Sequence, residues 1–222
     1  KQFFILGIIL DLKIMGFNLN DIKNFLDHRT PEDTLSLLNK QLHKLTKQIE
    51  LTTKLCDNIK SKINTINIYN DCKLNEITLS YREEEYFLVS EQIPLSLPQK
   101  ERFLAAATLL NSAVDKNGLK EYNLSGFIFN DTIADFSPES YKVFCKTNKS
   151  NHNYVKPYGL YLQICINTNF ADAVNTAKPF LIKFCQALNL KTNNIIYIKT
   201  LRNYWSTDSH DNFISKIEVP VL

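Results

Sequence analysis

Nine apolar residues and Thr52 follow one another at alternating spacings of three and four from Leu35 to Ile66, with no break in register. A helix over this stretch of about 32 residues is about 48 Å long. Such a helix cannot bury its apolar stripe against itself, so the stripe needs a partner. A strict 3.5-residue repeat is the pattern of a coiled-coil seam. We therefore predict a dimerisation helix within residues 30–70. Its seam is formed by Leu35, Leu38, Leu42, Leu45, Ile49, Ile59 and Ile63.

The alternative for this helix is that its stripe packs along the chain's own domain. The helix is too long for one short domain to cover its whole stripe, and this favours a homodimer. Shorter helices are expected before it. Residues 2–15 carry apolar side chains on more than one face, which predicts a buried helix ended by Gly16. Asn18 and Thr30 are each followed three residues later by an acid, which predicts a helix start at both positions.

The rest of the chain, residues 71–222, reads as a duplicated unit of strand, helix, strand and strand. Alternating or helical apolar patterns predict the first unit at residues 86–89, 98–116, 125–129 and 141–145. The second unit is predicted at residues 160–166, 170–188, 195–201 and 213–219. The offset between units is close to 71 residues, and the match is one of pattern rather than of residues. The predicted fold class is α+β, with a groove between the halves as the natural ligand site.

Composition excludes several classes of protein. Of 222 residues, 44% are hydrophobic, which is enough for a folded core. The net charge of +3 lies within residues 1–70 and excludes a strongly basic nucleic-acid coat. No apolar run approaches the length of about 20 residues that a membrane span requires. The five cysteines are odd in number and widely spaced, so we expect free thiols and a cytoplasmic protein.

Patterns of known catalytic sites are missing from the sequence. The four histidines are scattered, and neither an H-E-x-x-H nor a G-x-S-x-G motif occurs. No glycine-rich loop is available to cradle a phosphate. We therefore expect a protein that is not an enzyme, with no catalytic residues, no metal and no cofactor.

Residues 12–23, with the sequence LKIMGFNLNDIK, resemble the LK-x-x-GF-S-L-x-E-I-K stretch of MerR-family transcription regulators. In that family, too, a long dimerisation helix follows. The last part of the chain resembles the GyrI-like effector-binding domain of multidrug-responsive members. The likeness is carried by YNLSGFIF at residues 122–129, VKPYGLY at residues 155–161 and IEVPV at residues 217–221.

The resemblance implies three parts: residues 1–29 as the last helices of a DNA-binding domain, 30–70 as an antiparallel dimerisation helix and 71–222 as an effector-binding domain. It also implies a winged helix-turn-helix before Lys1, which would read promoter DNA in the major groove. The residues that contact bases are therefore expected outside this sequence.

The resemblance further implies a buried glutamate on the strand at residues 195–201, where drug-binding relatives hold a cationic ligand. That position falls on Ile198 or Lys199, and neither is acidic. Alternation along a strand allows only one of the two to face the groove. Glu83, Glu84, Glu85 or Glu218 could supply a carboxylate instead. We therefore expect a neutral or anionic ligand in preference to a lipophilic cation.

Aromatic residues on or beside the predicted strands are candidates for the ligand site, because their rings offer stacking surface. Packing into the core is an equally good interpretation for each of them. The candidates, together with Ile198 and Lys199, are Tyr86, Phe129, Tyr141, Tyr161, Tyr197, Trp205 and Phe213. The predicted function is a regulator that binds promoter DNA as a dimer and senses a small aromatic or lipophilic molecule. The alternative is a module that binds or sequesters small molecules without binding DNA.

Overall fold

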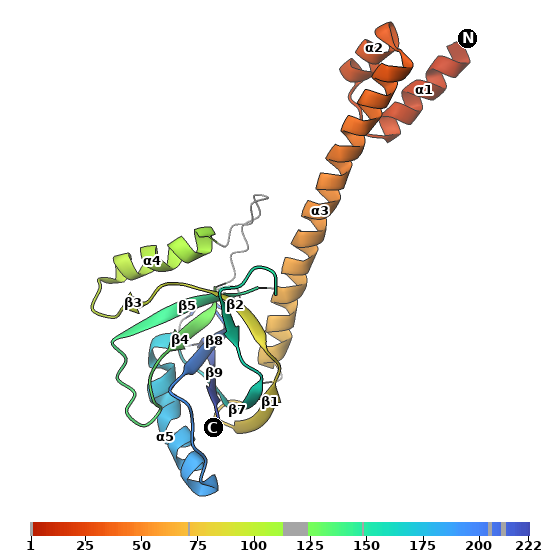
Figure 1. Cartoon of the computed structure of the whole chain (residues 1–222). Helices are drawn as coiled ribbons and strands as arrows, with labels where there is room; N and C mark the ends of the chain where they lie inside the picture. The colour runs from red at the N-terminus through yellow and green to blue at the C-terminus, as the bar shows by residue number, and fades with distance from the viewer. Residues whose placement is uncertain (1, 71, 113–123, 148, 204–205, 210–211) are drawn as a thin grey trace. The chain divides into compact units, whose positions relative to one another are not determined.

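The computed structural model describes residues 2–70, 72–112, 124–147, 149–203, 206–209 and 212–222 (Figure 1). The chain forms two compact units, residues 1–59 and residues 60–222, so their boundary lies inside a helix. The sequence-based boundaries, before residues 30 and 71, follow the ends of that helix instead. Together the units make an α+β protein, as expected.

Capping side chains and a glycine set the ends of the first three helices. They are α1 (Gln2–Ile14), α2 (Leu19–His28) and α3 (Pro31–Asn70). Gly16 adopts a positive φ of 87° after α1, and the Phe17 amide donates to the Leu12 carbonyl, which confirms the predicted glycine end. The Asn18 side chain accepts from the Asp21 amide at 2.9 Å, and that of Thr30 accepts from the Asp33 amide at 3.1 Å. Both predicted caps are confirmed.

The helix α1 is not buried within the single chain, which differs from the expectation. Its apolar side chains are largely exposed, with Phe3 and Ile14 each at 84%, and only Leu12 is closed off from solvent. The apolar residues are spread around α1, so one contact with α2 cannot cover them all.

The seam of α3 is also open to solvent in the single chain. Its leucine and isoleucine positions are 37% to 67% exposed. The helix extends the predicted repeat by a turn at each end, from Pro31 to Asn70. The described residues of α3 therefore carry an apolar stripe that this chain leaves uncovered.

The second unit is built on an antiparallel sheet of nine strands. Eight of them follow the order β1-β7-β9-β8-β4-β5-β2-β6, and β3 pairs with β5 off this path. The strand bounds are Ile77–Arg82 (β1), Glu85–Val89 (β2), Ile93–Pro94 (β3), Leu124–Phe129 (β4), Ser140–Lys146 (β5), Tyr154–Lys156 (β6), Gly159–Ile166 (β7), Ile196–Arg202 (β8) and Ile214–Pro220 (β9). The helix α4 (Gln99–Ser112) packs against β3 and β5, and α5 (Phe170–Leu188) packs against β7, β8 and β9.

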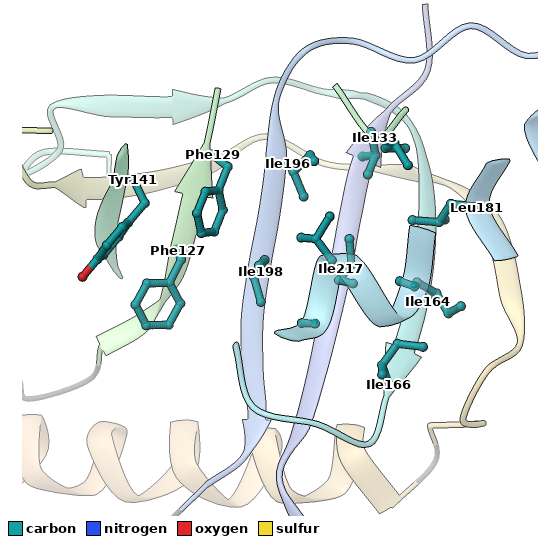
Figure 2. Close-up of a cluster of buried hydrophobic side chains, with 14 of the residues drawn as sticks. Phe127, Phe129, Ile133, Tyr141, Ile164, Ile166, Leu181, Ile196, Ile198 and Ile217 are labelled. Carbon is teal, nitrogen blue, oxygen red and sulfur yellow. The ribbon is translucent and has the colours of Figure 1, made fainter. Parts of the chain in front are cut away.

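The main core lies between the sheet and these helices. It joins isoleucines of β7, β8 and β9 to Leu181 and Val174 of α5, and continues to Phe127 and Phe129 of β4 (Figure 2). On the opposite face of the sheet lies a second, mostly aromatic cluster that includes Phe87, Phe144, Tyr161 and Tyr197. Each sheet face thus has its own buried cluster. Along a strand, residues of one cluster alternate with residues of the other.

The second stretch has the predicted order of strand, helix, strand and strand, whereas in the first the short strand β3 comes between β2 and α4. The strands that follow the two helices, β4 and β8, pair antiparallel at the centre of the sheet, with Phe127 opposite Ile198. Gly126 lies at this junction, where a Cβ atom would overlap the Ile198 carbonyl and the Phe144 ring. The close approach of β4 to β8 therefore requires glycine. An internal duplication remains a prediction.

The cysteines differ from the expectation of free thiols. Cys72 and Cys165 are joined as a disulfide, which links the chain after α3 to β7, whereas Cys56, Cys145 and Cys185 are free. The two cysteines are 93 residues apart in the sequence, and only the folded sheet brings them together, so their spacing could not predict the pair. Within the described ranges, no helix is both long enough and apolar enough to cross a membrane.

Candidate functional site

A cavity of about 840 Å³ lies between α4 and the sheet, with Ala171 and Asn175 of α5 along its edge. We call it the aromatic groove. Five of its fourteen described lining residues are aromatic, namely Phe103, Phe127, Phe129, Phe136 and Tyr141. Figure 2 shows three of these rings on neighbouring strands, with the rest of the core continuing along the same sheet face. A cavity of this size and composition is typical of a site for a small organic ligand.

Arg102 is the one charged residue in the described lining of the aromatic groove. Burial raises the pKa of the Tyr141 hydroxyl, against the opposing effect of the positive charge of Arg102. The Nε atom of Arg102 is shielded from solvent and has no hydrogen-bond partner among the described residues. A buried donor left unpaired is costly, so this atom favours a ligand that brings an acceptor.

The opposite face of the sheet carries a network of charged side chains, which we call the charged cluster. It comprises Arg82, Glu85, Lys146, Lys156, Lys199, Lys216 and Glu218. Glu218 of β9 is its centre and is fully buried. Its carboxylate lies 3.0 Å from the Lys199 Nζ and 3.2 Å from the Lys216 Nζ, and it also pairs with Lys156 and Arg82.

Glu85 of β2 is the second carboxylate of the charged cluster. Its oxygens lie 2.7 Å from the Lys199 Nζ, 3.1 Å from the Lys156 Nζ and 3.0 Å from the Lys146 Nζ. Burial alone raises the pKa of Glu85, but Lys199, Lys156 and Lys146 outweigh it and bring the pKa to about 2. The pKa of Glu218 is likewise lowered, because its lysine partners outweigh its burial. Both carboxylates are therefore ionised at neutral pH.

Lys156 has a cation-binding environment made by the chain itself. Its side chain is fully buried, and its Nζ lies 4.4 Å from the centre of the Tyr161 ring and 5.2 Å from that of Tyr197. Aromatic faces and a carboxylate are the groups that hold cationic ligands in proteins. Here they hold a lysine, although burial still lowers the pKa of Lys156 overall.

The residues predicted for the ligand site are divided between the two faces. Phe129 and Tyr141 line the aromatic groove, and Ile198 is buried in the main core on the same face without lining the groove. Tyr161, Tyr197 and Lys199 belong to the face with the charged cluster.

Three other candidates lie elsewhere. Tyr86 is partly exposed on β2 beside His152, and Phe213 is buried immediately before β9. Trp205 is outside the described residues.

Sequence reasoning missed Arg102 and most of the charged cluster. Glu218 carried a usable signal, because it stands between two apolar residues in a predicted strand. Lys156 carried none, since its strand, β6, has only three residues and was not predicted.

Comparison with known proteins gives a likeness of fold alone. No protein-family model matches the chain, and no curated protein matches it in sequence. Among solved structures, the crystal structure of the EcmrR C-terminal domain aligns with 66% of this chain and 97% of its own, at 12% identity and a TM-score of 0.50. The chain therefore contains the fold of that domain.

A second solved structure extends the likeness over both units. EcmrR in its complex with DNA, within EcmrR-RPo, aligns with 97% of this chain and 81% of its own, at 13% identity and a TM-score of 0.50. A hydrolase from Listeria innocua aligns with 68% of this chain and 94% of its own, at 10% identity. The TM-score of this alignment is 0.47.

Proposed function

We propose that this chain is a ligand-responsive transcription regulator of the MerR type. It binds promoter DNA as a homodimer, and its second unit, a GyrI-like domain, senses a small aromatic or lipophilic molecule. The observation that supports this proposal best is the aromatic groove, which lies in the fold of the EcmrR C-terminal domain. The likeness to EcmrR in its DNA complex supports the DNA partner.

The homodimer rests on the exposed seam of α3. Leu35, Leu42 and Ile49 lie on one stripe and are 63% to 67% exposed in the single chain. Burying such side chains contributes about 1.5–3 kcal/mol each. A second copy offers the same 3.5-residue repeat and so matches the stripe along its whole length.

The charge of the ligand follows from the groove lining. Arg102 is basic, and no carboxylate occurs among the described residues that line the groove. A lipophilic cation would lose its hydration there without gaining a counter-charge, which costs several kcal/mol. An aromatic ligand that is neutral or carries a carboxylate matches the rings and the Arg102 guanidinium.

The alternative is a protein that sequesters such ligands without contacting DNA; in both readings the protein binds rather than catalyses. The test uses the protein expressed from its native gene and a DNA fragment carrying the promoter of that gene. A regulator retards this fragment in a gel at physiological salt more strongly than a scrambled fragment, and an aromatic ligand changes the affinity. Equal retardation of both fragments, or none, would leave the sequestering module as the better account.

A further inference from the structure

The geometry points to a second ligand site, on the sheet face opposite the aromatic groove. We propose that the cavity above the charged cluster binds a small amphiphilic anion, with an apolar body and a carboxylate or phosphate group. This site is separate from the proposed sensing function, and neither depends on the other. Three observations support this site: the surplus of positive charge in the charged cluster, the residues that line the cavity and the volume of the cavity.

The charged cluster holds more positive than negative charge. Five cationic side chains share two carboxylates in the ion pairs of the described residues. Each carboxylate is already shared, Glu85 among three lysines and Glu218 among three lysines and an arginine. Further cations therefore have no full counter-charge in the cluster. Because Lys156 is fully buried and Lys199 and Lys216 are mostly so, water offsets this surplus only in part.

The lysine pKa shifts agree with a surplus of positive charge. Burial lowers the pKa of Lys216 in spite of Glu218, and the neighbouring charges of Arg82 and Lys199 lower it further. Lys199 contacts both carboxylates, and its pKa is raised although burial acts against it. An added anion would stabilise the charged form of each lysine in the cluster.

A cavity of about 330 Å³ opens beside this cluster. Lys146 and Lys199 line it together with Glu85, and Lys62 adds a cation from the last turns of α3. Burial lowers the pKa of Lys62. Ser125 and Ser206 also line it, with the Ser125 hydroxyl accepting from the Lys146 amide and the Ser206 hydroxyl donating to the Asn203 carbonyl. Ammonium donors around one space are groups that bind carboxylate and phosphate oxygens.

The other side of the cavity is apolar. Phe87 and Phe144 stack with ring centres 4.3 Å apart, and Leu201 and Ile66 also line the space. The two phenyl rings are themselves fully buried, so the apolar surface open to a ligand comes mainly from Ile66 and Ile68 of α3. An inorganic anion would leave this surface unused, whereas a ligand with a single ring or a short chain would cover it. The volume lies at the lower end of the range for organic ligands, which fits a one-ring compound.

The test is calorimetric titration of the full chain with four one-ring probes, in a buffer free of phosphate. Benzoate and phenyl phosphate carry the anion, whereas benzyl alcohol and benzylammonium share the ring without it. The site predicts that at least one anion binds about tenfold more tightly than benzyl alcohol, because hydrogen bonds to charged groups are the strong ones. The ranking of the two anions identifies the ligand as a carboxylate or a phosphate.

Variants locate the binding. Lys146→Gln removes a largely exposed lysine of the lining and should weaken anion binding about three- to tenfold, and Lys199→Met should weaken it more. Lys142→Gln is the matched control, since Lys142 lies on the same strand and face as Lys146 but outside the lining. Because the aromatic groove would also take an aromatic anion, the titrations are repeated in an Arg102→Gln background, which weakens that groove. In this background Lys146→Gln should still weaken anion binding, and Lys142→Gln should not.

Two results would overturn the proposal. One is equal binding of the anions and benzyl alcohol, including no binding of any probe. The other is anion binding that Arg102→Gln abolishes and Lys146→Gln does not change, which would assign the anion to the aromatic groove. Because Lys146 is 64% exposed, its variant should fold even if Lys199→Met does not.

Discussion

Ile198 and Lys199 are consecutive in β8 and serve opposite faces of the sheet. Ile198 is fully buried in the core beneath α5, whereas the Lys199 Nζ lies 2.7 Å from Glu85 and 3.0 Å from Glu218. The resemblance to drug-binding relatives places a glutamate at one of these two positions. On the helix-covered face an isoleucine stands there, and on the other face the chain's own lysines occupy the carboxylates. Both observations favour ligands other than cations.

The first prediction concerns the seam of α3. Replacing Leu42 and Leu45 together with Asp should convert the dimer to monomers, because four aspartates per dimer would be buried in an apolar interface. Light scattering measures the mass directly. The control is Ser36→Asp with His43→Asp, which adds the same charge on the polar side of the same helix. A fully dimeric seam variant would show that the stripe packs against another surface.

The second prediction compares the stability lost when a carboxylate of the charged cluster is removed with that lost when a lysine is removed. Glu218→Gln should destabilise the fold by about 3–5 kcal/mol, because it leaves several buried cations without their counter-charge. Lys156→Met should cost clearly less, about 2 kcal/mol or below, since it reduces the surplus of positive charge and fills similar volume. Urea unfolding of both variants gives the comparison. Equal losses, or a larger loss for Lys156→Met, would contradict the charge balance described above.

The third prediction follows from the pKa of Glu85, about 2 in the folded protein against 4.5 as its ordinary value. A lowered carboxylate pKa contributes stability above pH 4.5 and loses it as the pH falls towards 2. The free energy of unfolding should therefore decrease over this window. In Glu85→Gln the decrease should be smaller, by on the order of 1 kcal/mol after allowance for solvent screening. Glu84→Gln, on the exposed chain beside β2, is the control and should keep the wild-type dependence.

The fourth prediction concerns the junction of β4 and β8. Gly126→Ala should destabilise the second unit by about 2 kcal/mol or more, since its Cβ has no room beside the Ile198 carbonyl. Gly159→Ala provides the comparison, because the nearest atom to its Cβ would be in the Tyr161 ring at an ordinary 3.8 Å. Thermal unfolding measures both. An unchanged melting temperature in Gly126→Ala would mean that the strands can move apart at no cost.

Patterns that repeat along the sequence predicted the fold well. The helix at residues 170–188 has the bounds expected of it, and the strands of both predicted units lie within about two residues of their expected positions. Three strands were missed. The strand Ile77–Arg82 mixes polar and apolar residues, and its first residue, Ile77, pairs with Ile164 of β7, 87 residues further along the chain. Tertiary pairing therefore decides its conformation. The strands β3 and β6 are too short to show a period.

The site was less predictable than the fold. Phe129 and Tyr141 were among the candidates, yet the same reasoning also selected Tyr161 and Tyr197, which lie on the opposite face. Alternation shows that neighbours face apart, but only the packed helices determine which face is which. The charged cluster draws on residues 82 to 218, and no local pattern connects them before the sheet forms.

The central claim, that the aromatic groove binds an aromatic ligand by its rings and Arg102, is tested most directly with a pair of ligands of equal size. Naphthoate and naphthylmethylammonium are titrated into the wild type, Arg102→Glu and the control Lys100→Glu, which changes an exposed residue of the same helix. We predict that the wild type and Lys100→Glu bind naphthoate about tenfold or more tightly than the cation, and that Arg102→Glu loses or reverses this preference. Tighter binding of the cation by the wild type, or a preference that Arg102→Glu leaves unchanged, would contradict the account.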